Sequence, residues 1–284
     1  MRFNHFVLLT FMFMLANNTA KAQSSTATSS ASTSSTVVSK NKLSGKFSFG
    51  GRSDFQETSS SEKSYSSEYE IALGYQTDAE NSFSLNVPFE KELSGAYEAR
   101  FQLDTRLSHT RADLYQYKNL NLSFKSSLVY PTTEISKLER EMVAGFELSP
   151  IFSFDLNKYA TGLSFIYIPR YRKDFHKYTV DRSGNQISEQ SFLSIFVLNY
   201  NFWEKYTFQS ALVYVNSWRY DGAQGFDSYL TVQELSAQIT PKLGLTLGLE
   251  TAAALVNPER GESKGIQIFD KEVSQVYGKA SVVF

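Results

Sequence analysis

From Leu43 onward, apolar and polar residues alternate along the chain with a period of two. In the segment 243–250 every odd position is Leu, while the even positions are Gly, Thr, Gly and Glu. Successive side chains of an extended strand point to opposite faces, so this alternation predicts strands that each have one apolar face. The same pattern recurs at 43–49, 68–75, 82–89, 97–104, 119–128, 141–148 and 275–284.

The connections between these strands alternate between short and long. Short turns are predicted at 77–80, 201–204 and 240–242, and longer polar connections at 50–65, 173–187, 219–225 and 257–267. The stretch 149–160 is ambiguous and could contain an extra short pair of strands. With that stretch left open, the pattern predicts about twelve strands, within a range of roughly 10–14.

The first 42 residues do not share the alternation. Arg2 and the apolar run 6–16 are followed by Ala20-Lys21-Ala22, which together predict a secretory signal peptide over 1–22. The apolar run is too short for a helix that crosses about 30 Å of hydrocarbon. Residues 23–42 are almost all Ser, Thr, Ala and Lys, which predicts a flexible tether before the strand domain at 43–284.

Composition restricts the function classes. Aromatic residues make up 15% of the chain, the net charge is -1, and there is no cysteine. The absence of cysteine excludes disulfides, Cys-based metal sites and a lipid anchor on cysteine, and we expect neither a metal nor a cofactor. A charge near zero gives no reason to expect nucleic acid as a partner. A soluble β-sandwich would have less use for so many aromatic residues.

The last strand suggests a family. Counting back by twos from Phe284 gives Val282, Ala280, Gly278 and Val276, an apolar or small face, whereas the other face is mostly polar. An amphipathic final strand that ends on an aromatic residue resembles the C-terminal recognition signal of bacterial outer-membrane β-barrels. Together with the signal peptide and the alternating strands, the whole chain is similar to that superfamily.

The resemblance implies a fold, a location and partners. The expected fold is all-β, a transmembrane antiparallel up-and-down β-barrel. It would lie in the outer membrane of a Gram-negative bacterium, with both mature termini in the periplasm and the long loops outside. The implied partners are outer-membrane lipids, lipopolysaccharide and the barrel-assembly machinery, which would read Val276, Val282 and Phe284. Because every backbone polar group in hydrocarbon must be paired, the first and last strands must meet.

Three features depart from a regular pattern. The segments 161–172, 188–201 and 205–220 are apolar on both faces, so their lumen side chains are expected to pack on one another or on a loop. The strand 226–240 changes parity near Glu234, which predicts a β-bulge. Pro169 cannot donate to a ladder and is expected above the lipid zone or at a bulge.

If the alternation holds, charges of both signs face the lumen. The predicted lumen-lining residues are Glu98, Arg100, Asp104, Arg106, Lys125, Glu147, Arg170, Arg172, Glu250 and Lys279. A strongly ion-selective pore would carry one dominant sign, whereas mixed signs suit ion pairs that narrow the bore or a weakly selective channel. A barrel of about twelve strands lies between the filled eight-strand and the open sixteen-strand types, so size does not decide between the two.

The sequence contains few candidate catalytic residues. Asp174 and His176 lie on the same side of an extended strand and resemble half of the catalytic set of outer-membrane aspartyl-type proteases, but the companion Asp-x-Asp pair is missing. The neighbouring Arg170, Arg172, Lys173 and Lys177 suggest a solvated basic rim instead. We therefore expect no catalytic residue. The favoured function is a narrow, porin-like channel for passive transport of ions or small polar solutes. The alternative is a closed structural or surface-binding barrel acting through its extracellular loops, and an outer-membrane hydrolase is the third and least favoured hypothesis.

Overall fold

The computed structural model describes residues 42–55, 65–93, 100–102, 104–133, 135–203, 205–225, 227–255 and 265–284. The predicted signal peptide and nearly all of the predicted tether lie outside these residues. The described part of the barrel domain begins with a strand at Leu43.

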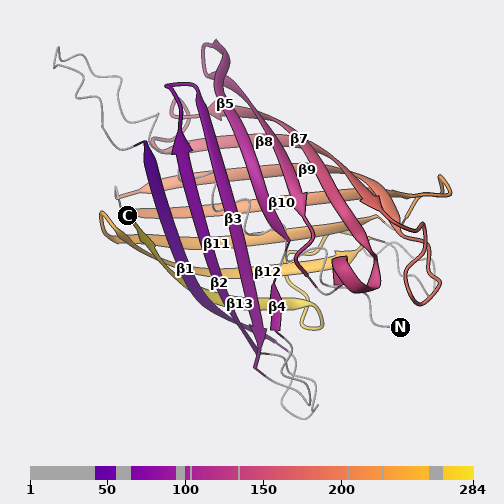
Figure 1. The fold of residues 1–284 in the computed structure, drawn as a ribbon. Helices are drawn as coiled ribbons and strands as arrows, with labels where there is room; N and C mark the ends of the chain where they lie inside the picture. The colour runs from indigo at the N-terminus through magenta and orange to yellow at the C-terminus, as the bar shows by residue number, and fades with distance from the viewer. Residues whose placement is uncertain are drawn as a thin grey trace. The chain divides into compact units, whose positions relative to one another are not determined.

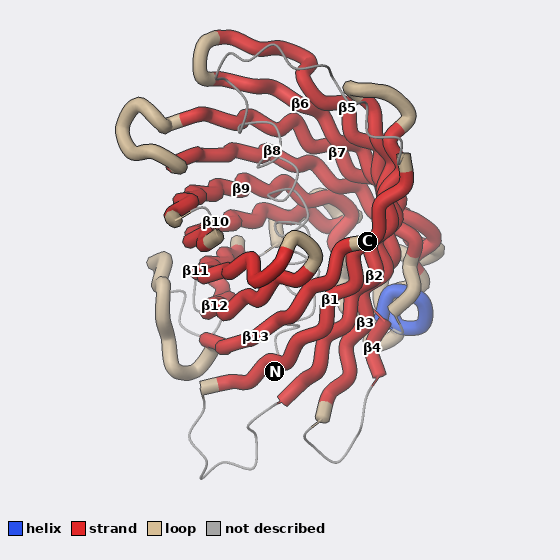
Figure 2. The backbone as a smooth tube through the Cα atoms, turned by 90° about the vertical axis from the view of Figure 1, so that its left-hand side faces the viewer, coloured by secondary structure: helices blue, strands red, loops and turns tan. Residues whose placement is uncertain are grey.

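The described strands form one antiparallel sheet that closes on itself (Figure 1; Figure 2). β4 and β5 both pair with β3, so they count as one interrupted barrel strand and the barrel has twelve. The prediction of an all-β, twelve-stranded, up-and-down barrel is confirmed. The strands are β1 (Leu43–Asp54), β2 (Tyr65–Gln76), β3 (Asn81–Glu92), β4 (Arg100–Gln102), β5 (Thr105–Tyr117), β6 (Leu120–Tyr130), β7 (Met142–Asp155), β8 (Leu163–His176), β9 (Ser188–Phe202), β10 (Tyr206–Arg219), β11 (Ser228–Thr240), β12 (Leu243–Ala254) and β13 (Ser274–Val283).

Helix is confined to one short turn in the described residues, a π-helix at Ile135–Glu139 between β6 and β7. No described helix is long and apolar enough to cross a membrane. β7 runs without interruption to Asp155, so the stretch 149–160 contains no extra pair of strands.

Closure depends on the pairing of β1 with β13. At the end of this seam, the Gly45 N–H donates to the Phe284 carbonyl and the Phe284 N–H donates to the Gly45 carbonyl, both at 2.9 Å. The Phe284 ring lies over Gly45, where a Cβ atom would overlap it. Val276 and Val282 lie on the outer face of β13 and are exposed, as is Phe284. Their role as an assembly signal stays a prediction.

The alternation inverts the arrangement of a soluble protein. On β1 the apolar Phe47 and Phe49 are exposed on the outer face, whereas Ser48 and Arg52 are buried on the inner face. On β12 the outward Leu247 is 66% exposed, while Thr246 points inward and shares a 2.8 Å hydrogen bond with Ser236. Apolar side chains therefore form the barrel exterior and polar side chains line much of its interior.

The predicted bulge near Glu234 is wrong. β11 pairs continuously through this residue, with Gln209 on one side and Gly248 on the other, and its register shifts only between Gln238 and Thr240. The apparent change of parity has another cause, because Leu230 and Val232 face inward while Leu235 faces outward.

Pro169 does not lie at a bulge either. It pairs with Ser194 of β9, and the β7–β8 ladder stops at Leu148–Tyr171 and resumes at Phe152–Tyr167 in the same register. The missing pairs lie where a proline of each strand, Pro150 and Pro169, removes a backbone N–H. The irregularity is therefore a gap in hydrogen bonding and not an inserted residue.

The break between β4 and β5 shifts the register by one residue. β4 pairs Arg100 with Lys91 and Phe101 with Glu90, whereas β5 pairs Arg106 with Asn86. The continuous alternation predicted over 97–104 is therefore wrong at this break. Arg100 occupies a register position opposite Lys91, and Glu98 lies outside the described residues.

The contact between Gly45 and Phe284 can be tested by filling it. We expect Gly45→Leu to displace the ring and to lower the free energy of unfolding by about 1–3 kcal/mol, the cost of overpacking. Gly51→Leu is the matched control, because Gly51 lies on the same outer face of β1 and its Cβ would be 3.8 Å from the nearest atom. Heat-modifiable gel mobility and the urea midpoint measure the effect, and equal losses in the two variants would contradict it.

The facing of β12 gives a second prediction. Replacing the exposed Leu247 by Arg should lower the free energy of unfolding by about 2–4 kcal/mol if this position lies near the bilayer midplane. Arg in place of the inward Thr246 should cost less, because the charge can remain in the lumen. Urea unfolding in lipid vesicles compares the two, and the reverse order would mean that the register is displaced by one residue.

Candidate functional site

The inner face of the barrel has three sectors that differ in chemistry. The basic sector comprises Asp104, Arg106, Lys125, Glu147, Arg170, Arg172 and Asp174 on β5–β8 and just before β5. The acidic sector comprises Arg52, Glu68, Glu70, Glu90, Glu234, Glu250 and Lys279 on β1–β3 and β11–β13. The apolar sector comprises Ile166, Ile168, Ile195, Val197, Ala211, Val213, Leu230 and Val232 on β8–β11.

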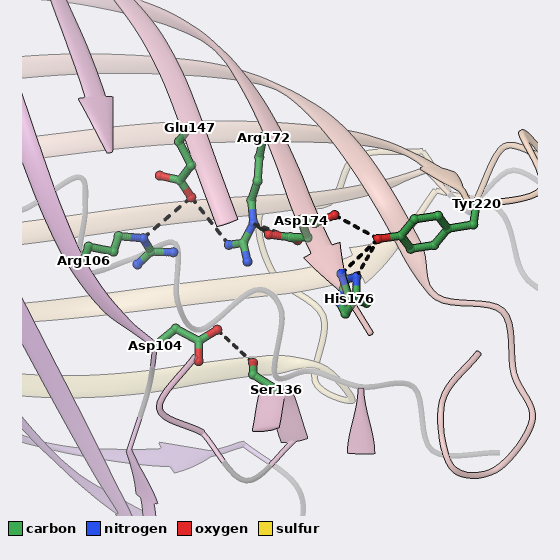
Figure 3. Close-up of polar contacts among 8 residues, drawn as sticks. All are labelled: Asp104, Arg106, Ser136, Glu147, Arg172, Asp174, His176 and Tyr220. Carbon is green, nitrogen blue, oxygen red and sulfur yellow. Dashed lines mark hydrogen bonds and ion pairs between the residues drawn. The ribbon is translucent and has the colours of Figure 1, made fainter. Parts of the chain in front are cut away.

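Glu147 is the centre of the basic sector. Its Oε1 lies 3.6 Å from Nε of Arg106 and 3.5 Å from Nη1 of Arg172 (Figure 3). Nε of Arg172 also donates to Asp174, at 2.8 Å to Oδ1 and 3.0 Å to Oδ2. The Glu147 side chain is only 3% exposed, so each of these charges depends on its neighbours for compensation.

Strand register explains this arrangement. Glu147 pairs directly with Arg172 across β7 and β8, and the next inward pair is Gly145 with Asp174. A Cβ at position 145 would lie 2.6 Å from Oδ1 of Asp174, so only glycine leaves room for that carboxylate. Arg170, one inward position nearer the N-terminal end of β8, donates from Nε to Oγ of Ser149 at 3.1 Å.

Asp104 links the basic sector to the connection between β6 and β7. Its carboxylate accepts a hydrogen bond from Oγ of Ser136 at 2.8 Å (Figure 3) and another from the backbone N–H of Thr132 at 3.0 Å. The N–H of Thr133 donates to the same carboxylate at 3.3 Å. Asp104 therefore holds the β6–β7 connection in place as well as contributing charge.

Asp174 and His176 bind different partners, and their lack of a catalytic role stays a prediction. The carboxylate of Asp174 is bound by Arg172, while both the backbone N–H and Nδ1 of His176 contact the hydroxyl of Tyr220, at 3.1 and 3.2 Å. That hydroxyl donates to the Asp174 backbone carbonyl at 3.1 Å (Figure 3). A general base needs an orienting partner and a nearby nucleophile. The contacts of Asp174 and His176 instead tie the C-terminal end of β8 to Tyr220.

The sequence suggested that the basic residues at the end of β8 form one solvated rim, but the structure separates them. Arg170 and Arg172 face the lumen, and Arg170 is 2% exposed. Lys173 forms an ion pair with Glu189, and the exposed Lys177 lies 3.6 Å from Glu141. Within the described ranges, no group of three or more His, Asp or Glu side chains could hold a metal ion.

Arg52 is the centre of the acidic sector. Its Nη2 lies 2.6 Å from Oε1 of Glu68, and its Nη1 lies 3.2 Å from Oε2 of Glu250. Nζ of Lys279 lies 3.2 Å from the other oxygen of Glu68. Both cations also lie over the ring of Tyr277, at 5.7 Å for Arg52 and 4.7 Å for Lys279.

Sequence reasoning missed Arg52 because it placed residues 50–65 in an outer loop. The inward parity of Ser48 and Gly50 continues to Arg52 and Asp54, and that continuation was the signal that could have found it. Tyr277 was also missed. Its hydroxyl donates to Glu234, and its ring occupies the space beside Gly248 that a side chain would fill.

The apolar sector consists of two rows that run across four strands. One row is Ile168, Ile195, Val213 and Leu230, and the other is Ile166, Val197, Ala211 and Val232. All eight side chains are at most 4% exposed. The segments that looked apolar on both faces are therefore apolar both toward the exterior and toward the lumen.

The remaining predicted lumen residues lie on the inward register of the described strands. These are Asp104, Arg106, Lys125, Glu147, Arg170, Arg172, Glu250 and Lys279. The sectors segregate charge. The acidic sector sets five carboxylates against Arg52 and Lys279, whereas the basic sector sets Arg106, Lys125, Arg170 and Arg172 against three carboxylates.

Removing the charge of Glu147 tests the basic sector. Glu147→Gln should lower the free energy of unfolding by about 3–5 kcal/mol, because Arg106 and Arg172 lose a buried counter-ion. Glu141→Gln is the matched control, since its pair with the exposed Lys177 is worth about 0–1 kcal/mol. Urea midpoints measure both, and a small loss at Glu147 would mean that water already solvates these guanidinium groups.

Comparisons with known proteins bear on the fold. No family model matches the chain, and no curated protein matches it. An outer membrane channel from Pseudomonas putida F1 matches with a TM-score of 0.61 and 13% identity, covering 85% of this chain and 95% of that chain. The NanC porin matches with a TM-score of 0.50 and 12% identity, covering 84% and 98%. The chain therefore has the fold of the bacterial outer-membrane β-barrel proteins.

Proposed function

We propose that this protein is an outer-membrane channel through which ions and small polar solutes pass passively along a narrow lumen. The observation that carries the proposal is the set of ion-paired charges on the inner face, contributed by strands on two sides of the barrel. The two similar structures are described as a channel and a porin, which supports the same function class.

The distribution of burial supports a narrow passage. Inward residues near the periplasmic turns are polar and partly exposed, as are Ser44, Gln76 and Gln238. Farther up the strands, inward charges such as Glu68, Glu147 and Arg170 are 2% exposed. The described wall is thus a polar vestibule that leads to a layer of closely packed, paired charges, which favours small solutes.

The composition of this layer argues for a polar path. Burying ion pairs is costly, and replacing them by well-packed apolar side chains is often neutral or stabilising. The apolar sector demonstrates that this chain fills part of its interior in that way. Charges retained beside an apolar wall fit a narrow path for polar solutes better than an apolar core.

The location and partners follow from the same proposal. We propose insertion in the outer membrane with the short turns and both mature termini in the periplasm. Outer-membrane lipids and lipopolysaccharide would surround the apolar exterior. The barrel-assembly machinery would recognise the outward face of β13 that carries Val276 and Val282.

Conductance in planar bilayers tests the channel. The mature chain should give small, discrete steps, and Lys125→Glu should shift the reversal potential under a salt gradient toward cation permeability. Lys125 faces the lumen between Thr110 and Ser149, whereas the control Lys158→Glu changes an exposed residue in the β7–β8 turn. The control should leave the reversal potential unchanged, since distant exposed charges are screened.

Absence of conductance from correctly folded protein would overturn the channel. It would favour the alternative, a closed structural or surface-binding barrel that acts through its outer loops. The observation that favours this alternative is the burial of inward charges such as Glu68, Glu147 and Arg170.

A further inference from the structure

The outer face of β11–β13 carries polar side chains where an outer-membrane barrel should meet lipid. Tyr229, Thr231 and Thr251 have outward parity, and Ser274 begins β13 on the same side. Their exposed fractions are 1%, 4%, 0% and 1%, although neighbouring outward residues such as Leu247 are largely exposed. Something other than lipid covers these four residues.

The cover is the segment 265–270, here called the strap. Its backbone bonds to the four side chains in turn: the Gln267 N–H donates to the Tyr229 hydroxyl at 3.0 Å, and Thr231 donates to the Gln267 carbonyl at 3.3 Å. Thr251 donates to the Ile268 carbonyl at 2.7 Å, and the Asp270 N–H donates to Oγ of Ser274 at 2.8 Å. The strap therefore crosses β11, β12 and β13 on the outside of the barrel.

The apolar side chains of the strap point away from these contacts. Ile266, Ile268 and Phe269 are 51%, 61% and 49% exposed. The ring of Phe269 meets that of Phe55, just beyond β1, edge to face with centroids 5.3 Å apart. The strap thus bonds four of its backbone groups to barrel hydroxyls and presents a new apolar surface, and both features lower the cost of placing it in hydrocarbon.

The height of Thr251 places it within the expected lipid zone. A strand tilted by about 40° rises about 2.5 Å per residue along the barrel axis, so an apolar band of about 25 Å needs about ten residues. Counted from Leu243 at the start of β12, ten residues reach beyond Thr251. Without the strap, the hydroxyls of Thr231 and Thr251 would face acyl chains.

We propose that the strap is a lipid-contacting element, with Ile266, Ile268 and Phe269 seated among acyl chains of the outer leaflet. The strands that it crosses also carry exposed apolar residues on their outward face, namely Leu245, Leu247 and Val276. The inference rests on the barrel spanning a membrane, as in the proposed function, but not on the lumen conducting ions.

Spin labels test this directly, because the chain has no cysteine. Ile268→Cys, Leu247→Cys and Ser183→Cys, each in the mature chain, are nitroxide-labelled and reconstituted into phosphatidylethanolamine–phosphatidylglycerol vesicles. Label accessibility to oxygen, which concentrates in lipid, is compared with accessibility to a water-soluble nickel chelate. Ile268 should match the lipid control Leu247 and differ several-fold from Ser183, an exposed residue of the β8–β9 connection.

The other possible results at positions 268 and 247 contradict either the lipid contact of the strap or membrane insertion of the barrel. A label at 268 that behaves like Ser183 refutes the lipid contact. Spin–spin broadening at 268 that disappears on dilution with unlabelled protein assigns the surface to a second copy of the chain. A water-exposed label at Leu247 refutes membrane insertion itself, and with it both the strap and the proposed function, whereas absent conductance alone leaves the strap untouched.

The hydroxyl contacts provide a second variant. Thr251→Val in the Ile268→Cys background removes the donor to the Ile268 carbonyl, so nickel accessibility and label mobility at 268 should both rise several-fold. Thr246→Val is the control, because it removes a hydroxyl from the lumen side of the same strand. Unchanged accessibility with Thr251→Val would mean that this bond does not hold the strap.

Discussion

The structure depends on the need to pair every backbone N–H and C=O group within the barrel wall. The reciprocal bonds between Gly45 and Phe284 meet that need at the seam where β1 joins β13. The same constraint explains the irregular parts. Where Pro150 and Pro169 remove donors, the ladder is interrupted without a register shift, and where the strap leaves the sheet, side-chain hydroxyls take the place of a neighbouring strand.

Closure sends the polar faces inward, and strand register then decides which charges meet. Glu147 lies opposite Arg172, and Gly145 provides space for Asp174, so β7 and β8 supply the centre of the basic sector, to which β5 adds Arg106. Arg52 forms ion pairs with Glu68 and Glu250 on the other side. Each sector nevertheless keeps an excess of one sign among its described side chains, with four cations against three carboxylates in the basic sector and five carboxylates against two cations in the acidic sector.

The features that could be predicted from the sequence are those that the alternation of apolar and polar residues encodes. A period of two reports strands and facing wherever one face is polar, which holds for β12 and explains why the strand number and closure were predictable. The alternation does not predict a break such as that between β4 and β5. A register shift of one residue changes the pairing with β3 but leaves the pattern within each of the two strands regular. Arg52 was missed because its strand continues into a Gly- and Ser-rich stretch that has the composition of a loop.

The misinterpretation of β11 has a more specific cause. Tyr229, Leu230, Thr231 and Val232 are all at most 4% exposed, so both faces of the strand are covered at its N-terminal end. There the apolar side chains point inward and the polar ones outward, as in a soluble protein, whereas Glu234 and Leu235 follow the membrane arrangement. A reversal of polarity within one regular strand looks like a bulge in sequence. It is stable only where the strap supplies hydrogen-bond partners outside and the apolar rows supply contacts inside, so the two exceptions to the barrel pattern are aspects of one local inversion.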